Sequence, residues 1–344
     1  MKSNIFGLDI GQSTIKAVWL STEKEGYLLD AVLSIPTPAN TMLSESALDQ
    51  QELAGVIKKI VEDAKIEAKS VNIALPENQV YTKIIEVPYM SDKDLSSAIY
   101  WEAEQQIPVA LTNLTLDYKV LEHSEKGDAS QKMRVLLVGT ATRLIEKYQK
   151  ILSLAGLEIA AVETEVLSVM RAIVPPEVIY PTSLIVCMGT FNTSLTIVRK
   201  NTIVFTYSVP LGGAAITRAI AAKFGFSTTQ AEEYKKIYGL SESNFEGKIA
   251  QAAEPILVSI LGEVKKTFAY HRNMYKDDPI MQITLTGGPA KLPGLPTFFA
   301  KHAGIETTVA NPWKILFEQD VPKEIIDNAP EYTVAVGLAM RNND

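Results

Sequence analysis

Residues 4–20 read NIFGLDIGQSTIKAVWL, two apolar runs separated by a glycine and three polar residues. The runs Ile5–Ile10 and Ile15–Leu20 predict two strands joined by a tight turn. Such a turn exposes backbone N–H groups that can hold a phosphate. A carboxylate, Asp9, interrupts the first apolar run. An ordinary glycine hairpin explains this stretch equally well, so the rest of the chain has to decide between the two interpretations.

The stretch at residues 183–201, SLIVCMGTFNTSLTIVRKN, repeats the design of strand, glycine, small polar residues and strand. Overlaying residues 8–11 on residues 186–189 aligns Asp9 with Cys187. The same overlay brings Thr190, Asn192 and Thr193 near Gln12, Ser13 and Thr14. An internal similarity of such long period predicts two halves of related build. If the two turns face one another, they form a clamp for phosphates.

The composition limits the class of protein. A chain of 344 residues suggests about two domains at a nominal ~150 residues each. The net charge of −7 argues against a nucleic-acid surface, which needs clustered Lys and Arg. A single cysteine, Cys187, favours a reducing compartment. No secretory apolar segment and no apolar run near ~18 residues is present in the sequence. We therefore expect a cytoplasmic protein that reaches a membrane only through a partner.

The order of apolar runs predicts a mixed α/β protein with an insertion. Three strand-like runs are followed by a helix whose apolar residues recur every three or four positions, and then by the short apolar run SVNIALP. From residue 84 to residue 160 the pattern changes, which predicts a small inserted subdomain around the polar loop EHSEKGDASQK. The proline-rich segment IVPPEVIYPTS predicts a boundary. The expected division is 1–83 with 161–182 and 325–344, then 84–160, and then 183–324.

The second half carries further glycine pairs. Gly212 and Gly213 stand at a predicted helix start, where the N-terminal dipole favours an anion. A second pair, Gly287 and Gly288, ends the predicted strand QITLT. The chain has no G-x-G-x-x-G or Walker A sequence and no G-x-S-x-G elbow. Rival phosphate-binding and hydrolase motifs are therefore excluded.

Taken in order, these motifs resemble the actin-like ATPase superfamily, whose duplicated, ribonuclease H-like fold has two domains. Within it the chain most resembles the PilM family of type IV pilus assembly proteins, which is similar to the division protein FtsA. The likeness rests on LDIGQSTIKAV (8–18), VPYMSDKDLSSAIYWEAEQQIP (87–108), AEEYKKIYG (231–239), LTGGPAKLPGL (285–295) and NPW (311–313). WEAEQQIP carries the most weight, because it lies in the subdomain that PilM and FtsA insert.

The resemblance implies ATP and Mg²⁺ bound between the two domains. The residues that it assigns to ATP are Gly11, Gln12, Ser13, Thr14 and Lys16, then Gly189, Thr190, Asn192 and Thr193, and finally Gly212, Gly213, Glu232, Lys235, Gly287, Gly288 and Lys291. Asp9 would hold Mg²⁺ through water, since Mg²⁺ keeps much of its hydration shell. Glu163 or Glu165 would position an attacking water.

One position departs from the family pattern. The second phosphate turn of the superfamily usually begins with Asp, and here that residue is Cys187. A thiol with a pKa near ~8.5 cannot hold a magnesium-bound water as a carboxylate does. We therefore expect ATP binding with weak or absent hydrolysis.

Three functional classes stay open at the level of the sequence. The first is a nucleotide-binding scaffold of the type IV pilus platform, or of a related type II secretion system. It would bind the N-terminal cytoplasmic peptide of a PilN-like inner-membrane protein and other platform proteins, without nucleic acid and without inserting into the membrane. The second is an FtsA-like division protein that forms filaments or other homo-oligomers. The third, an actin-fold phosphotransferase, needs a working second phosphate turn, and Cys187 argues against it.

Overall fold

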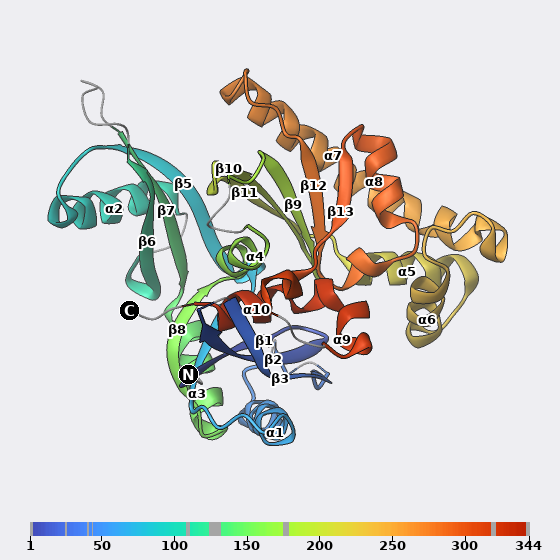
Figure 1. The fold of residues 1–344 in the computed structure, drawn as a ribbon, viewed down its shortest axis with the longest axis horizontal. Helices are drawn as coiled ribbons and strands as arrows, with labels where there is room; N and C mark the ends of the chain where they lie inside the picture. Colours follow the sequence, from blue (N-terminus) through green and yellow to red (C-terminus); the bar gives the residue numbers. More distant parts are fainter. Residues whose placement is uncertain are drawn as a thin grey trace.

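The computed structural model describes residues 3–24, 26–39, 41–42, 44–107, 111–123, 132–174, 179–317 and 321–341. Most of the predicted polar loop at 122–132 and much of the proline-rich boundary lie outside these residues. Figure 1 shows two large sheets, one in each half, and a smaller sheet to one side.

The first sheet has the order β3 (Gly26–Pro36), β2 (Thr14–Glu23), β1 (Ile5–Ile10), β4 (Ser70–Leu75) and β8 (Glu158–Thr164). Two helices, α1 (Ala47–Asp63) and α3 (Thr142–Leu154), pack against it. The predicted apolar stripe of α1 lies in this core, where Leu53, Ile57 and Ile60 are buried. The sequence pattern and the packing agree here, because one helix face meets one sheet face.

The second sheet repeats the first. Its order is β11 (Thr202–Val209), β10 (Thr193–Arg199), β9 (Ser183–Met188), β12 (Gln282–Thr286) and β13 (Glu306–Val309). Both sheets pair their first three strands antiparallel and their last three parallel. The repeated build that the two glycine hairpins predicted is therefore confirmed.

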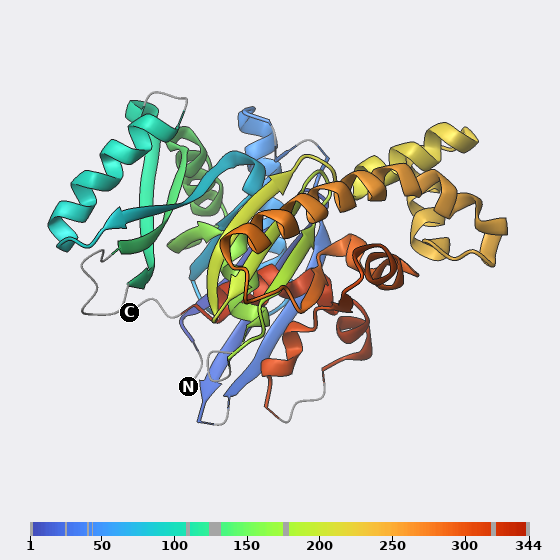
Figure 2. The ribbon, with the colours of Figure 1, turned by 90° about the horizontal axis from the view of Figure 1, so that it is seen from above.

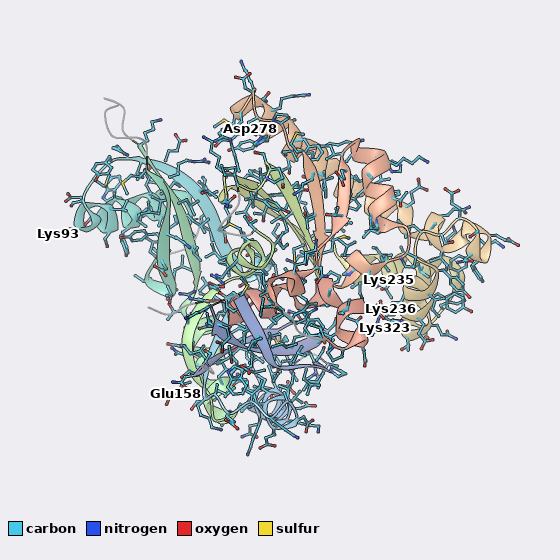
Figure 3. All side chains as sticks on the ribbon, viewed as in Figure 1. Lys93, Glu158, Lys235, Lys236, Asp278 and Lys323 are labelled. Atoms are coloured by element: carbon cyan, nitrogen blue, oxygen red, sulfur yellow. The ribbon has the colours of Figure 1, made fainter. Side chains whose placement is uncertain are left out.

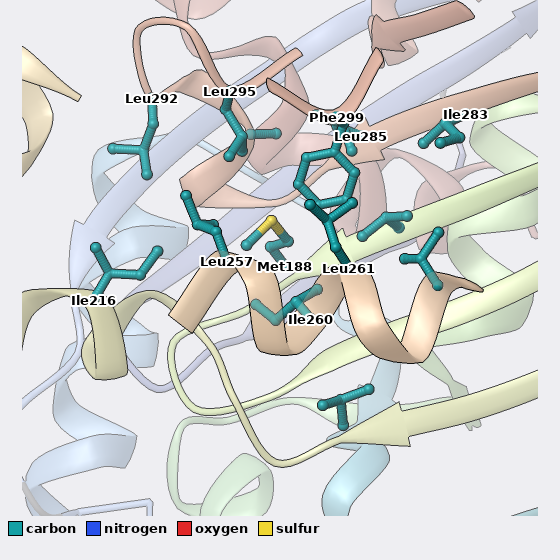
Figure 4. Close-up of a cluster of buried hydrophobic side chains, with 14 of the residues drawn as sticks. Met188, Ile216, Leu257, Ile260, Leu261, Ile283, Leu285, Leu292, Leu295 and Phe299 are labelled. Atoms are coloured by element: carbon teal, nitrogen blue, oxygen red, sulfur yellow. The ribbon is translucent and has the colours of Figure 1, made fainter. Parts of the chain in front are cut away.

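Four helices accompany the second sheet: α5 (Gly213–Phe224), α6 (Thr228–Tyr238), α7 (Lys248–Met274) and α8 (Leu295–Ala303). Figure 4 shows Ile260 and Leu261 of α7 beside Met188 and Phe299 in the core of this half. Figure 2 shows α7 running along the second sheet. Pro255 lies inside α7, which begins at Lys248.

The inserted subdomain contains the third sheet. It consists of β5 (Val80–Pro88), β7 (Lys132–Ala141) and β6 (Leu114–His123), in that order, with α2 (Asp92–Gln106). These elements lie between Val80 and Ala141, and α3, which follows them, packs on α1 of the first half. The sequence could not show this, since an amphipathic helix does not reveal which sheet its apolar face covers.

The two halves meet through α4 (Glu165–Ile173) and α10 (Thr333–Ala339), with α9 (Lys323–Asp327) nearby. A Cβ atom at Gly337 would lie 1.9 Å from the carbonyl oxygen of Ser168, so only glycine permits this contact between α10 and α4.

The short 3-10 helices are Glu77–Gln79 (η1), Leu111–Asn113 (η2), Asn244–Gly247 (η3), Gly288–Lys291 (η4), Pro312–Ile315 (η5) and Ala329–Tyr332 (η6). Within the described ranges, we find no helix both long and apolar enough to cross a membrane.

Candidate functional site

The two glycine turns have the same backbone hydrogen bond. The N–H of Gly11 donates to the carbonyl oxygen of Thr14 at 3.1 Å, and the N–H of Gly189 donates to that of Asn192 at 2.8 Å. The strand pairs that close the turns are Ile10 with Ile15 and Met188 with Thr193. Both turns therefore contain four residues, and each begins with the predicted glycine.

The register of the two hairpins keeps the overlay of residues 8–11 on residues 186–189 through both turns, so Thr193 corresponds to Ile15 rather than to Thr14. Thr193 lies in β10 with a buried side chain, and its hydroxyl donates to the carbonyl of Leu211 at 2.7 Å. Asn192 is the structural equivalent of Thr14, and Phe191 is that of Ser13. Sequence reasoning missed Phe191 because an aromatic residue is not a phosphate-binding type.

The two turns touch one another. The hydroxyl oxygens of Ser13 and Thr190 lie 2.8 Å apart, which places both predicted residues at one point between the halves. The loop after β3 supports the first turn, because the hydroxyl of Thr37 donates to the carbonyl of Gly11 at 2.7 Å. The N–H of Thr37 also donates to the carbonyl of Ser13 at 3.0 Å. No sequence signal marked Thr37.

Lys16 and Asp9 face one another across β1 and β2, where they are directly paired. The ammonium of Lys16 lies 3.5 Å from the carboxylate of Asp9 and donates to the hydroxyl of Thr14 at 2.7 Å. Burial raises the pKa of Asp9, although Lys16 opposes the rise. The corresponding pair in the second half is Cys187 and Ser194, so only the first turn has a charged pair.

Three carboxyl groups influence the neutral Cys187. Burial and the charges of Glu165, Asp9 and Glu77 raise the pKa of the Cys187 thiol well above its usual value. Glu165, the first residue of α4, has a strongly raised pKa because of burial and of the charges of Glu77 and Asp9. Glu77 accepts a hydrogen bond from the N–H of Val166 at 3.1 Å, and burial raises its pKa to about 7. Glu165 therefore belongs to the electrostatic surroundings of Asp9, and no pattern in the sequence marked Glu77 as part of them.

Glu163 has a different environment. Its buried carboxylate receives hydrogen bonds from Arg171 at 2.8 Å, Ser168 at 2.7 Å and Arg341 at 2.7 Å. Burial alone would raise the pKa of Glu163, but these donors lower it. The contacts join β8, α4 and the segment after α10. Of the two predicted water-positioning residues, Glu165 is the one whose pKa is raised by the charge of Asp9.

Glu232 and Lys235 form the predicted pair on α6. The buried ammonium of Lys235 donates to Glu232 at 2.6 Å, to the hydroxyl of Thr217 at 2.9 Å and to the carbonyl of Gly213 at 3.2 Å. These three bonds use the three N–H groups of the ammonium. Lys235 therefore positions Glu232, whose carboxylate is about one-third exposed and can accept from a ligand hydroxyl. Figure 3 labels Lys235 and its neighbour Lys236 in the second half.

The two glycine pairs play different parts. A Cβ atom at Gly212 would lie 2.6 Å from the carbonyl oxygen of Gly189, and the N–H groups of Gly213 and Ala214 donate to Gly189 and Thr190. The start of α5 therefore supports the second turn. The N–H groups that do so stand at the helix start where the sequence predicted an anion. Gly288, in contrast, has open space where a Cβ would be, with only Glu331 at 3.9 Å, so a ligand can approach there.

Gly287 must be glycine because its φ is +86° and a Cβ atom would lie 2.2 Å from the carbonyl oxygen of Met188. The ammonium of Lys291 pairs with Glu331 at 2.6 Å and also contacts Asn328. A surface cavity of about 480 Å³ adjoins this segment and is lined partly by Lys291, Pro293 and Ile326.

The residues present fit a nucleoside triphosphate with Mg²⁺. Two touching glycine turns, one ammonium beside them and one adjacent carboxylate form a set of groups suited to phosphates and a hydrated cation. The open face of Gly288 and the fixed carboxylate of Glu232 flank this set in the second half.

Comparison with known proteins places this arrangement in a family. A family model described as "Type IV pilus assembly protein PilM" matches residues 7–343. The chain is 24% identical over 334 residues to the cell division protein FtsA of Streptococcus pneumoniae serotype 2 (strain D39 / NCTC 7466), covering 84% of this chain and 71% of the relative.

Solved structures agree with this match. The structure of a PilM–PilN type IV pilus biogenesis complex is 26% identical, with a TM-score of 0.86 over 99% of each chain. The ethanolamine utilization protein EutJ of Carboxydothermus hydrogenoformans is 16% identical, with a TM-score of 0.58 over 98% and 89% of the chains. MreB5 of Spiroplasma citri, bound to AMPPNP, is 13% identical, with a TM-score of 0.55 over 97% and 94%. The last two show the fold alone, and they confirm the predicted actin-like architecture.

The glycine turns, the duplicated sheets and the inserted subdomain thus occur together in a chain that belongs to the PilM family of type IV pilus assembly proteins.

Proposed function

We propose that this protein is a cytoplasmic scaffold of the type IV pilus assembly platform that binds ATP and Mg²⁺ between its two halves. The observation that carries the nucleotide part is the contact of Ser13 with Thr190, which brings the two glycine turns together beside Lys16. The actin-like fold of the chain supports it. Membership of the PilM family supports the role in pilus assembly.

The residues divide the binding task between them. The N–H groups of the two turns and the ammonium of Lys16 would bind phosphate oxygens, while Glu232 would accept hydrogen bonds from the ribose. Asp9 would hold the water shell of Mg²⁺. When bound, the metal neutralises charge on the phosphates. Because Cys187 supplies no second carboxylate, we expect ATP to act as a structural ligand with very slow turnover.

We further propose that the protein binds the N-terminal cytoplasmic peptide of a PilN-like inner-membrane protein, which recruits it to the inner face of the membrane. A PilM–PilN complex has the same fold over nearly the full chain, which supports this partner. The inserted subdomain is the candidate surface. Trp101 on α2 is 66% exposed there, although tryptophan is on average highly buried in folded proteins.

The nucleotide proposal is tested by thermal unfolding with and without Mg²⁺–ATP. Ligand at about 100 times its dissociation constant stabilises a protein by about 2.7 kcal/mol. Lys16→Ala should lose most of this stabilisation, because the ammonium lies beside the turns. Lys59→Ala, which removes an exposed lysine of α1, is the matched control. A folded wild-type protein that shows no response to Mg²⁺–ATP would contradict the proposal.

The partner proposal is tested by titrating a synthetic PilN-like peptide against the full chain. Trp101→Ala should weaken peptide binding, whereas Leu48→Ala, which removes an exposed apolar residue of α1, should not. Equal peptide affinity for both variants and the wild type would place the peptide site outside α2.

A further inference from the structure

The inserted subdomain is connected by the chain to one half and contacts the other. Its connections at 76–79 and 141–142 lead to β4 and α3 of the first half. Its strand β5, however, lies beside β11, an edge strand of the second sheet. The guanidinium of Arg134, on β7, donates to the carbonyl of Val204 in β11 at 3.2 Å.

Arg134 also meets an aromatic ring of the second half. Its guanidinium carbon lies 5.9 Å from the centre of the Tyr275 ring, and that of Arg199 lies 4.6 Å from the same ring. Both distances are within the range of a cation–π interaction. Tyr275 directly follows α7, so its backbone moves with the second half.

The second half fixes Tyr275 from several sides. Arg199 is held by the carboxylate of Asp278 at 2.7 Å, and the other oxygen of Asp278 accepts from Thr182 at 2.7 Å. The imidazole of His271 lies 5.0 Å from the Tyr275 ring and 2.8 Å from the carbonyl oxygen of Asp278. Figure 3 labels Asp278 at the outer end of α7. The residues around Tyr275 are therefore held in place by contacts within the second half, independently of Arg134.

These contacts differ in strength, which matters for movement. Arg199 lies close to the ring and has its own carboxylate, whereas Arg134 lies near the outer limit of a cation–π contact and bonds a backbone carbonyl. The cluster around Tyr275 thus belongs to the second half. Arg134 is the residue of the cluster that can leave it, because its contact is the weaker one. We name the pair Arg134 and Tyr275 the latch.

We propose that the latch fixes the inserted subdomain to the second half, so that the insert moves with that half when the angle between the halves changes. Because the insert is joined by the chain to the first half, such a change must bend its two connections. This inference rests on the proposed function, because a nucleotide bound between the two halves would set the angle between them. Nucleotide binding would then change the position of the insert relative to the first half, which couples a surface on the insert to the nucleotide.

Spin-label distance measurements on the full chain test the proposal. Lys93→Cys on α2 and Lys301→Cys on α8 report the position of the insert relative to the second half. Lys58→Cys on α1 and Lys301→Cys report the angle between the halves, and all three lysines are exposed. The wild-type chain, with Cys187 as its only cysteine, gives the labelling background.

The first comparison needs no nucleotide. Arg134→Met should add a second population to the distance distribution between labels 93 and 301, and Tyr275→Leu should do the same. Lys132→Met is the matched control, because Lys132 lies on the same strand and pairs with Glu86 inside the insert. Identical distributions in the wild type and Arg134→Met would overturn the latch.

The second comparison adds Mg²⁺–ATP. We expect the distance between labels 58 and 301 to shift while that between 93 and 301 stays constant, and Arg134→Met should remove this constancy. A wild-type shift of 93–301 as large as that of 58–301 would show that the insert moves with the first half, which overturns the proposal. ATP binding with no shift of 58–301 would overturn the coupling. No ATP binding at all would contradict the proposed function, while the nucleotide-free comparison still decides the latch.

Discussion

The hydroxyl oxygens of Ser13 and Thr190 lie 2.8 Å apart although 177 positions separate them in the chain. Each belongs to the turn of a glycine hairpin, and the two hairpins come from sheets of the same strand order. The contact therefore sets how closely the two candidate phosphate turns approach.

We expect Ser13 and Thr190 to be coupled in stability. A hydrogen bond of this kind contributes about 0.5–1.5 kcal/mol, and removing either hydroxyl loses it. In a double-mutant cycle, Thr190→Val should then destabilise the Ser13→Ala protein less than it destabilises the wild type. Urea unfolding of the four proteins measures the coupling. Additive effects would show that the two turns do not depend on one another.

A carboxylate at position 187 should make the protein depend on a divalent cation. Cys187→Asp adds a fourth acidic group near Asp9, Glu77 and Glu165, whose charges already oppose ionisation of the thiol. We expect a lower melting temperature than for Cys187→Asn, and recovery on adding Mg²⁺–ATP, measured by calorimetry. Hydrolysis of ATP should also rise above the slow wild-type rate. Rapid hydrolysis by the wild type, lost in Asp9→Ala, would show that one carboxylate suffices.

Glu77 should make the folded protein less stable as the pH rises. Below pH 4.5 its carboxyl is protonated in both the folded and the unfolded chain. Between pH 4.5 and about 7 only the folded chain keeps the proton, so the free energy of unfolding falls, and above about 7 the loss is complete. At 1.36 kcal/mol per pKa unit the loss is on the order of 3 kcal/mol.

Glu77→Gln should remove that loss, because an amide carbonyl still accepts from the N–H of Val166 and carries no charge. Urea unfolding at pH 5 and pH 8 should show the variant stabilised relative to the wild type at pH 8 and little changed at pH 5. Glu67→Gln, which replaces an exposed glutamate, is the control. A variant less stable than the wild type at pH 8 would contradict the expectation.

Gly337→Ala should destabilise the protein by about 1–3 kcal/mol or more, because its Cβ would lie 1.9 Å from the carbonyl oxygen of Ser168. Gly55→Ala, in α1, is the matched control, since a Cβ there meets no atom within 4 Å. Alanine at that site should stabilise the helix by up to about 1 kcal/mol. Thermal unfolding of both variants should give shifts of opposite sign.

Arg171→Met should leave the buried carboxylate of Glu163 short of a partner. Breaking a buried ion pair from one side costs about 3–5 kcal/mol when the other charge is left without a partner. Because Arg341 and Ser168 still bond Glu163, we expect a loss of stability in urea below that range, and a smaller loss for Glu163→Gln, which removes the charge as well. If Glu163→Gln instead keeps full stability and loses ATP hydrolysis, its role lies in the chemistry.

The sequence alone predicted those helices and strands whose residue pattern lies within one short segment. The hairpin of β1 and β2 follows from a glycine between apolar runs, and the stripe of α1 follows from its period. The repeat of the hairpin was enough to predict a second sheet of the same build. The residues that begin both turns, Gly11 and Gly189, were predicted correctly.

What the sequence could not predict depends on contacts between distant segments. The pairing of Glu163 with Arg341 joins residues 178 positions apart, and nothing local marks it. Lys235 was predicted as a ligand-facing residue, but its three bonds to protein atoms appear only when α5 and α6 pack together.

The contact between β1 and α10 has a consequence for how this chain matures on the ribosome. A Cβ atom at Gly7 would lie 2.3 Å from the carbonyl oxygen of Ala335, so β1 is built against a helix, α10, that is synthesised long after it. Asn72 on β4 likewise donates to the carbonyl of Leu338 at 3.0 Å. The N-terminal sheet must therefore wait, with one face uncovered, until residues 333–339 have left the exit tunnel. During that interval its exposed apolar strands are the segment most in need of a chaperone.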